Sequence, residues 1–203
     1  MLPEERGVRN FCDNIQAQFD AHVETIRLSR DELGDQIQST SEVLIRCLSS
    51  GGKILAFGNG GSATQADHFV GELVGRFQFA RRPLAAVSLP ASPGMVTCIA
   101  NDFGFAELFA RQVEALATPG DVAVGLTTSG QSENVLRGLA AARKAGIGSI
   151  ALTGGGGLTS LPADYQIRVP STSTARIQEV HLLIIHIWCT LIDQTFAKTA
   201  TDP

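Results

Sequence analysis

The chain of 203 residues is poor in cysteine, tryptophan and tyrosine, and neither sign of charge dominates it. Its four cysteines lie far apart and form no CxxC pair, which argues against a disulfide framework and against a thiolate zinc site. A net charge of −4 gives the chain no general attraction for nucleic acid. One basic group, Arg76 with Arg81 and Arg82, is expected to form a solvated loop rather than a binding patch.

Targeting and membrane signals are also lacking. The start, MLPEERGVRNF, has neither the basic region nor the apolar run of a secretory signal peptide. No apolar stretch is expected to reach the length of a membrane span. We therefore expect a cytoplasmic protein with no nucleic-acid partner and no membrane partner.

Nucleotide-binding signatures are missing or incomplete. No GxxxxGK[ST] loop occurs. Residues 58–63, GNGGSA, match the GxGxxA form of the dinucleotide fingerprint, but the next expected strand ends in Ser88, Leu89 and Pro90, with no carboxylate for a ribose hydroxyl. The alternative is that these glycines permit a tight turn.

The first 50 residues have helical spacing. Phe11, Ile15 and Phe19 recur at four-residue steps, and Leu33 and Ile37 continue the pattern, which predicts two amphipathic helices with a break near Ser29. A helical hairpin of this size cannot bury its apolar stripes alone. We therefore expect residues 1–50 to form an N-terminal helical hairpin used in oligomerisation, ahead of a main domain at residues 51–198.

The rest of the chain alternates short apolar runs with helical segments. The expected strands are 53–58, 84–89, 121–128, 148–154 and 164–170, and the expected helices are 63–78, 92–117 with a break around 101–102, 131–145 and 175–196. This alternation predicts a doubly wound parallel sheet with helices on both faces. Ligands bind at the carboxyl ends of such strands, which draws attention to the loops GNGGS, TTSGQS and TGGGG.

The loop at residues 127–132 is a candidate phosphate site. Four hydroxyl residues occur in six positions directly before an expected helix, whose first N–H groups favour an anion. A single hydroxyl that caps the helix would be the simpler explanation, but a cap needs only one such residue. The loop therefore predicts the binding of a phosphate monoester.

Candidate acid–base residues lie on two helices. His68 and Glu72 are four residues apart and share a helix face. The last helix carries Gln178, Glu179, His181 and His186 within an apolar stretch, where polar groups are costly unless they are paired. Each of them could equally be structural, but together they suggest proton transfer or a metal site near the phosphate.

Five blocks in order resemble the phosphoheptose isomerases of the sugar isomerase (SIS) domain superfamily: GNGGSATQADHFVGELVGRF, IANDFGF, LTTSGQSENV, ALTGGGG and ARIQEVHLLIIH. The resemblance implies an α/β fold, a flavodoxin-like three-layer α-β-α sandwich with a five-stranded parallel sheet, assembled as a homotetramer. It also implies the interconversion of D-sedoheptulose 7-phosphate and D-glycero-D-manno-heptose 7-phosphate through an enediol, on the way to bacterial lipopolysaccharide or related glycans.

The resemblance further implies roles for individual residues. Glu72 and His186 fall on the catalytic positions. Substrate-binding positions are Asn59, Gly60, Gly61, Glu72, Asn101, Asp102, Thr127, Thr128, Ser129, Ser132 and Gln178. The zinc-binding positions are His68, Glu72, Gln178 and His186, with one Zn²⁺ per subunit. At about 100° per residue, however, Glu179 is closer to His186 around the helix than Gln178 is.

A second reading comes from non-catalytic members of the same superfamily. The bacterial adaptor that binds the replication initiator DnaA resembles the chain, particularly in ARIQE and the following LID. These relatives lack the full acid–base set, whereas both Glu72 and His186 occur here. The isomerase is therefore the primary expectation and the adaptor is the alternative.

Overall fold

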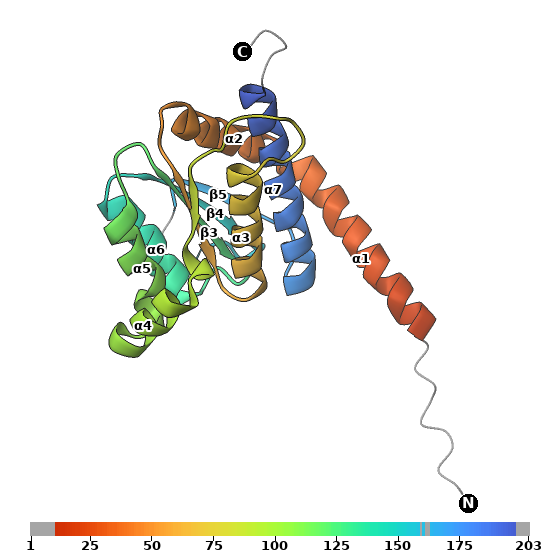
Figure 1. Ribbon diagram of the computed structural model, residues 1–203. Coiled ribbons are helices and arrows are strands. Elements are labelled where there is room, and N and C mark those ends of the chain that lie inside the picture. Colours follow the sequence, from red (N-terminus) through yellow and green to blue (C-terminus); the bar gives the residue numbers. More distant parts are fainter. Residues whose placement is uncertain (1–10, 159, 161–162, 198–203) are drawn as a thin grey trace, which may run out of the picture.

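The structure is a computed structural model that describes residues 11–158, 160 and 163–197. Figure 1 shows helices on both faces of a central sheet. The strands are β1 (Ile54–Gly58), β2 (Ala86–Ser88), β3 (Val122–Thr127), β4 (Gly148–Thr153) and β5 (Tyr165–Arg168). The helices are α1 (Phe11–Glu32), α2 (Gly34–Ser49), α3 (Gly61–Val74), α4 (Pro93–Phe103), α5 (Leu108–Leu116), α6 (Glu133–Lys144) and α7 (Thr174–Phe196), with 3-10 turns η1 (Leu89–Ala91) and η2 (Phe105–Glu107).

The five strands form one sheet in the order β2-β1-β3-β4-β5, and every pair is parallel. The chain order reverses between β1 and β3, which is where ligands bind in sheets of this kind. The predicted three-layer α/β sandwich with a flavodoxin-like strand order is confirmed.

Alternate residues of β1 face two separate cores. Ile54 and Ala56 pack into a core that also contains Trp188 of α7, together with parts of α2 and α3. Leu55 and Phe57 pack into the opposite core, where the rings of Phe57 and Phe109 lie 5.0 Å apart. The side-chain alternation of a strand thus produces the two helical layers.

The two N-terminal helices meet at Leu33 rather than near Ser29. Backbone hydrogen bonds from Leu33 N to Ser29 O and from Ile37 N to Leu33 O continue through the junction. The pair is therefore bent rather than folded back on itself, and α1 points away from the sheet in Figure 1. By contrast, α2 buries Leu44 and Leu48 in the core beneath the sheet.

Helix α7 corrects the expectation that no stretch reaches the length of a membrane span. Among the described residues it is the one helix long and apolar enough by length and composition. It packs against α1, α2 and α3, and it buries His181 and Asp193. Since His181 hydrogen-bonds Thr153 and Asp193 pairs with Arg81 within the domain, α7 is a core helix rather than a membrane span.

Two predicted helix ends were also wrong. The break expected around residues 101–102 lies at Gly104, whose φ of 90° ends α4. Helix α3 ends at Val74 rather than at residue 78, because the side chain of Arg81 donates a hydrogen bond to the carbonyl of Leu73 in the last turn. Both corrections move loops that lie close to the predicted site.

Candidate functional site

The hydroxyl loop after β3 has the form of an anion cradle. The Thr127 hydroxyl lies 3.1 Å from that of Ser132 and 3.4 Å from that of Ser129, whose oxygen also accepts a hydrogen bond from Gln131 N at 3.2 Å. Ser132 is the N-cap residue of α6, yet its side chain makes no capping hydrogen bond. Helix capping therefore does not account for this group of hydroxyls, and the ligand interpretation is favoured.

Glycine backbone closes the cradle on its far side. Gly130 has a φ of 68°, and a Cβ there would lie 1.8 Å from the carbonyl oxygen of Gly157. A Cβ at Gly154, directly after β4, would lie 2.5 Å from the carbonyl oxygen of Thr128. The loops after β3 and β4 are thus in direct backbone contact, as expected for two loops at the same edge of a parallel sheet.

The loop after β1 is held beside the cradle by a pair of side-chain amides. Asn59 donates to Oδ1 of Asn134 at 2.8 Å, and Asn134 donates back to Oδ1 of Asn59 at 2.8 Å. Asn134 is buried at the start of α6 and also accepts a hydrogen bond from Val135 N. Asn134 was missed in the sequence, although it lies only two residues after the last residue of the hydroxyl loop.

The predicted acid–base residues of α3 and α7 meet. Nε2 of His68 lies 3.0 Å from Nε2 of His186 and 3.4 Å from Oε1 of Glu72. The ring of Phe77 stacks on His186 at 5.4 Å with a 17° angle between planes. Glu72 is partly shielded, with 21% of its side chain exposed. His68 therefore contacts both Glu72, on its own helix, and His186, on α7.

The side chain of Gln178, rather than that of Glu179, faces α3. A Cβ at Gly61 would lie 2.6 Å from Nε2 of Gln178. Glu179 instead binds residues toward α1: it lies 2.7 Å from His22 Nδ1 and accepts from Arg176 at 2.5 Å. Helix α7 lies between α3 and α1 in Figure 1. The neighbouring residues Gln178 and Glu179 can therefore contact different helices, Gln178 on the side of α3 and Glu179 on the side of α1. The roles of Gln178 in substrate and zinc binding stay predictions.

Asn101 and Asp102 occupy the last turn of α4 and are exposed. Asn101 donates to Asp102 at 2.8 Å, and the Cys98 thiol lies 3.7 Å from the Asp102 carboxylate. These contacts are local to α4. A sugar-binding role for the pair accordingly stays a prediction.

His181 is a structural histidine. It is fully buried, and its Nε2 donates to the carbonyl of Thr153 at 3.2 Å. Burial lowers the pKa of His181 to about 4, although the hydrogen bond with Thr153 acts in the opposite direction. Among the polar residues of α7, it belongs to the core.

The expectation of a solvated basic loop is wrong for Arg81. Its side chain is 1% exposed and forms an ion pair with Asp193 of α7, with 2.6 Å between Nε and Oδ1. The signal that could have revealed it is Asp193 itself, a carboxylate within an apolar helix that needs a buried cationic partner.

The side chains at the contact between α3 and α7 are of the kinds that bind zinc. No group of three or more His, Cys, Asp or Glu side chains in the described part of the chain is arranged to hold a metal ion. Two neighbouring ligands of a tetrahedral zinc lie about 3.3 Å apart, given Zn–N bonds of about 2.0 Å. The 3.0 Å and 3.4 Å separations around His68 match this spacing. The spacing therefore fits two pairs of zinc ligands, His68 with His186 and His68 with Glu72.

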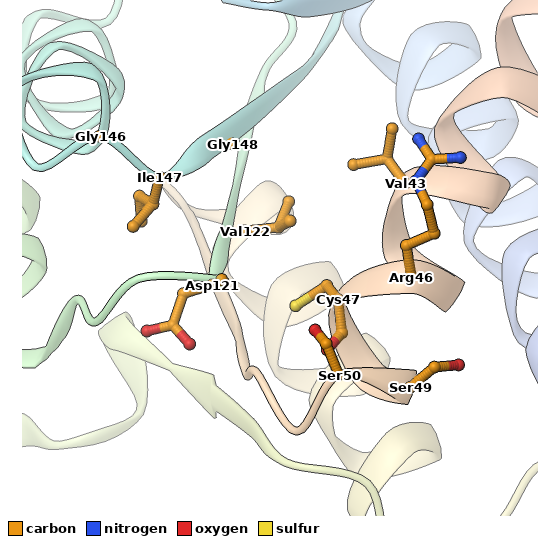
Figure 2. A pocket seen from close by; sticks show the side chains of 11 residues that line it. Val43, Arg46, Cys47, Ser49, Ser50, Asp121, Val122, Gly146, Ile147 and Gly148 are labelled. Atoms are coloured by element: carbon orange, nitrogen blue, oxygen red, sulfur yellow. The ribbon is translucent and has the colours of Figure 1, made fainter.

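A separate hollow lies at the opposite end of the sheet (Figure 2). It has a volume of about 680 Å³ and is lined by Arg46, Cys47, Asp121 and Ile147, among others, where β3 and β4 begin. Asp121 there is bound by the ammonium group of Lys53. None of the predicted site residues contributes to this hollow, so it is distinct from the candidate site.

Comparison with known proteins gives the family. Residues 18–154 match the model of the SIS domain. The phosphoheptose isomerase of Helicobacter pylori (strain P12) is 45% identical over 186 residues, which cover 91% of this chain and 97% of the relative. The phosphoheptose isomerase of Aquifex aeolicus (strain VF5) is 47% identical over 171 residues, covering 83% and 90%.

Solved structures agree. The phosphoheptose isomerase of Francisella tularensis superposes with a TM-score of 0.87 at 36% identity, covering 91% of this chain and 99% of the other. The corresponding protein of Neisseria gonorrhoeae gives 0.84 at 39% identity, covering 91% and 100%. The chain therefore belongs to the SIS domain family, a class of α/β proteins. Within this family, the four relatives described above are phosphoheptose isomerases.

Proposed function

We propose that the protein is an aldose–ketose isomerase that interconverts D-sedoheptulose 7-phosphate and D-glycero-D-manno-heptose 7-phosphate. The observation that carries this proposal is the contact of His68 with both Glu72 and His186. The shared identity with phosphoheptose isomerases over nearly the whole chain supports the same activity. No observation favours the adaptor of the replication initiator DnaA, the alternative weighed on the sequence.

The chemistry moves one proton between neighbouring carbons. A base removes a proton from the carbon beside the carbonyl while an acid protonates the carbonyl oxygen, which gives an enediol. The carbon base then returns its proton to the former carbonyl carbon while the other hydroxyl loses its proton and becomes the new carbonyl. Glu72 and His186 divide these roles, one acting on carbon and the other on oxygen. His68, 3.0 Å from His186, fixes the orientation of that imidazole. Phe77 covers one face of the His186 ring and limits its rotation.

The remaining residues hold the open-chain sugar. Thr127, Thr128, Ser129 and Ser132 bind the phosphate with their hydroxyls and with the N-terminus of α6. The close backbone of Gly60 and Gly61 and the amides of Asn59 and Gln178 line the sugar, and Asn101 and Asp102 complete this part of the site. The phosphate is remote from the reacting carbons, so its binding energy serves to position them.

His68, Glu72, Gln178 and His186 would hold one Zn²⁺ per subunit. A bound zinc polarises oxygen and stabilises negative charge that develops on it. Removal of metal with a chelator is expected to lower turnover strongly, and stoichiometric Zn²⁺ is expected to restore it. The measurement is the initial rate together with the metal content of the purified protein. Full activity in protein free of metal would contradict the zinc assignment.

The assembly, the location and the pathway belong to the same proposal. We infer a cytoplasmic homotetramer that supplies heptose for bacterial lipopolysaccharide or a related glycan. Incubation of the protein with sedoheptulose 7-phosphate, followed by NMR of the product, tests the reaction. A pull-down with the replication initiator on the same sample distinguishes the adaptor, which would bind the initiator and leave the sugar unchanged.

A further inference from the structure

The buried ion pair between Arg81 and Asp193 joins the two helices that carry the acid–base residues. Neither side chain is exposed by more than 1%. A buried pair of charges is costly to form and is weak evidence for stability alone. The contacts that the pair makes beyond itself therefore indicate its purpose.

Arg81 holds the last turn of α3. Its Nη2 donates to the carbonyl of Glu72 at 2.7 Å, and its Nη1 donates to that of Leu73 at 2.9 Å. These carbonyls belong to the unpaired C-terminal end of the helix, where a cation is also favoured by the helix dipole. The guanidinium group thus fixes the backbone of Glu72 itself.

Asp193 holds the face of α7 that carries His186. The two residues are seven positions apart, which at about 100° per residue places them within roughly 20° around the helix. Through Nε, Arg81 reaches Asp193 at 2.6 Å. One planar guanidinium group therefore spans from the backbone of Glu72 to the helix face of His186.

The same carboxylate holds the loop that carries Phe77. Asp193 Oδ2 accepts from Gln78 N at 2.7 Å and from Phe79 N at 2.9 Å. Burial by itself raises the pKa of the Asp193 carboxyl, but these N–H groups together with Arg81 hold the pKa below its usual range. Phe77, directly before Gln78, is thereby kept stacked on His186.

We propose that Arg81 and Asp193 are positioning residues that set the relative placement of Glu72 and His186, an inference that rests on the proposed isomerase function. Neither side chain touches the reacting groups. Arg81 acts through the backbone of Glu72, and Asp193 acts through the helix face of His186 and the loop of Phe77. Misplacement of catalytic groups by about 1 Å can cost a hundredfold in rate.

The test uses Arg81→Lys, which keeps the charge but loses the fork that reaches both helices at once. We expect kcat to fall about ten- to a hundredfold while KM stays within about twofold, because the sugar and phosphate contacts are unchanged. Arg82→Lys is the matched control. Arg82 is exposed and its guanidinium lies 5.3 Å from the ring centre of Phe196. This variant should retain the kcat of the unmodified protein.

The imidazoles give a readout that does not depend on turnover. The chain has four histidines, so their ring nitrogens can be resolved by NMR in protein treated with chelator. In Arg81→Lys the signals of His68 and His186 should move, whereas those of His181, buried on the same helix, should stay. Movement of all three would indicate a general loss of packing and would overturn the positioning role.

Further outcomes also decide the proposal. If Arg81→Lys does not fold, Asp193→Asn replaces it, because an amide keeps the shape of the carboxylate but cannot accept from Arg81 and from both backbone N–H groups at once. Its His186 signals should move with those of His181 unchanged. Unchanged kcat and unchanged His186 signals in the folded variant would overturn the proposal, as would unchanged His186 signals in Asp193→Asn. If the unmodified protein shows no turnover, the isomerase function fails, while the imidazole signals still decide whether the pair positions the two helices.

Discussion

His181 and His186 lie five residues apart on α7 and have different environments. His181 is enclosed by the core, with its Nε2 bound to a backbone carbonyl and no partner for Nδ1 among the described residues. His186 faces α3 and has a second imidazole and an aromatic ring against it. The neutral form of His181 is required by the fold, whereas His186 is available for proton transfer.

The buried state of His181 predicts how stability depends on pH. Its pKa is about 4 in the folded protein, against an ordinary value of 6.5, so the unfolded chain binds the additional proton first. Stability is therefore complete above pH 6.5, decreases as pH falls, and has lost up to about 3 kcal/mol near pH 4. Urea unfolding between pH 7.5 and 4 measures this. A His181→Gln variant should show a weaker dependence, and an equal slope in both proteins would contradict the assignment.

Residue types near the site were more predictable than their partners. The hydroxyl loop and the spacing of His68 and Glu72 are visible in the sequence because each is local. The contact of His68 with His186 and the amide pair of Asn59 with Asn134 join residues more than 70 positions apart. A single sequence indicates that such polar groups need partners but does not say which ones. For this reason Arg81 was misplaced in solvent.

At the scale of elements, the loop between β3 and α6 depends on the absence of one side chain. Gly130 has a left-handed φ of 68°, and a Cβ at this position would lie 1.8 Å from the carbonyl oxygen of Gly157. Gly146, at the other end of α6, has a similar φ of 71° but nothing within 4 Å. A side chain at Gly146 would therefore meet only an unfavourable backbone conformation, whereas a side chain at Gly130 would also clash with backbone.

Gly130→Ala is expected to raise KM for the sugar phosphate at least about tenfold, because the hydroxyl loop must move away from Gly157. Gly146→Ala bears only the cost of the left-handed conformation, about 1 kcal/mol of stability, with kcat and KM unchanged. Steady-state kinetics and thermal unfolding of both variants check this. Equal KM values for the two would show that Gly130 has no special role in the loop.

The strand–helix alternation gave the sheet and its helices correctly, because buried parallel strands are short apolar runs. Helix ends were less predictable. Helix α3 ends where the side chain of Arg81, which lies outside the helix, donates hydrogen bonds to its last carbonyls. The bend between α1 and α2 lies at Leu33, four residues after Ser29. These ends are decided by tertiary contacts rather than by the local sequence.

At the scale of the whole molecule, α1 leaves an apolar stripe uncovered. Ile15, Phe19 and Val23 are 57%, 64% and 63% exposed. Figure 1 shows this helix projecting from the rest of the domain. Apolar side chains gathered on one face of a helix require a partner surface, and the proposed homotetramer would supply it.

Light scattering should therefore give a mass of four chains of 21.5 kDa. Phe19→Asp should shift the mass toward smaller species, because a charge on the stripe opposes its burial. Ala17→Asp introduces the same charge on the opposite side of α1 and should leave the mass unchanged. A single-chain mass for the unmodified protein, or equal masses for both variants, would contradict the role assigned to this helix.

The central claim is that Glu72 and His186 carry out the proton transfer of a sugar-phosphate isomerase. The most direct measurement is the initial rate of sedoheptulose 7-phosphate conversion, followed by NMR, for the unmodified protein, Glu72→Gln and His186→Ala. We predict conversion by the unmodified protein and a loss of at least about a hundredfold in each variant, in line with removal of an acid or base. No conversion by the unmodified protein, or an undiminished rate in either variant, would contradict the account.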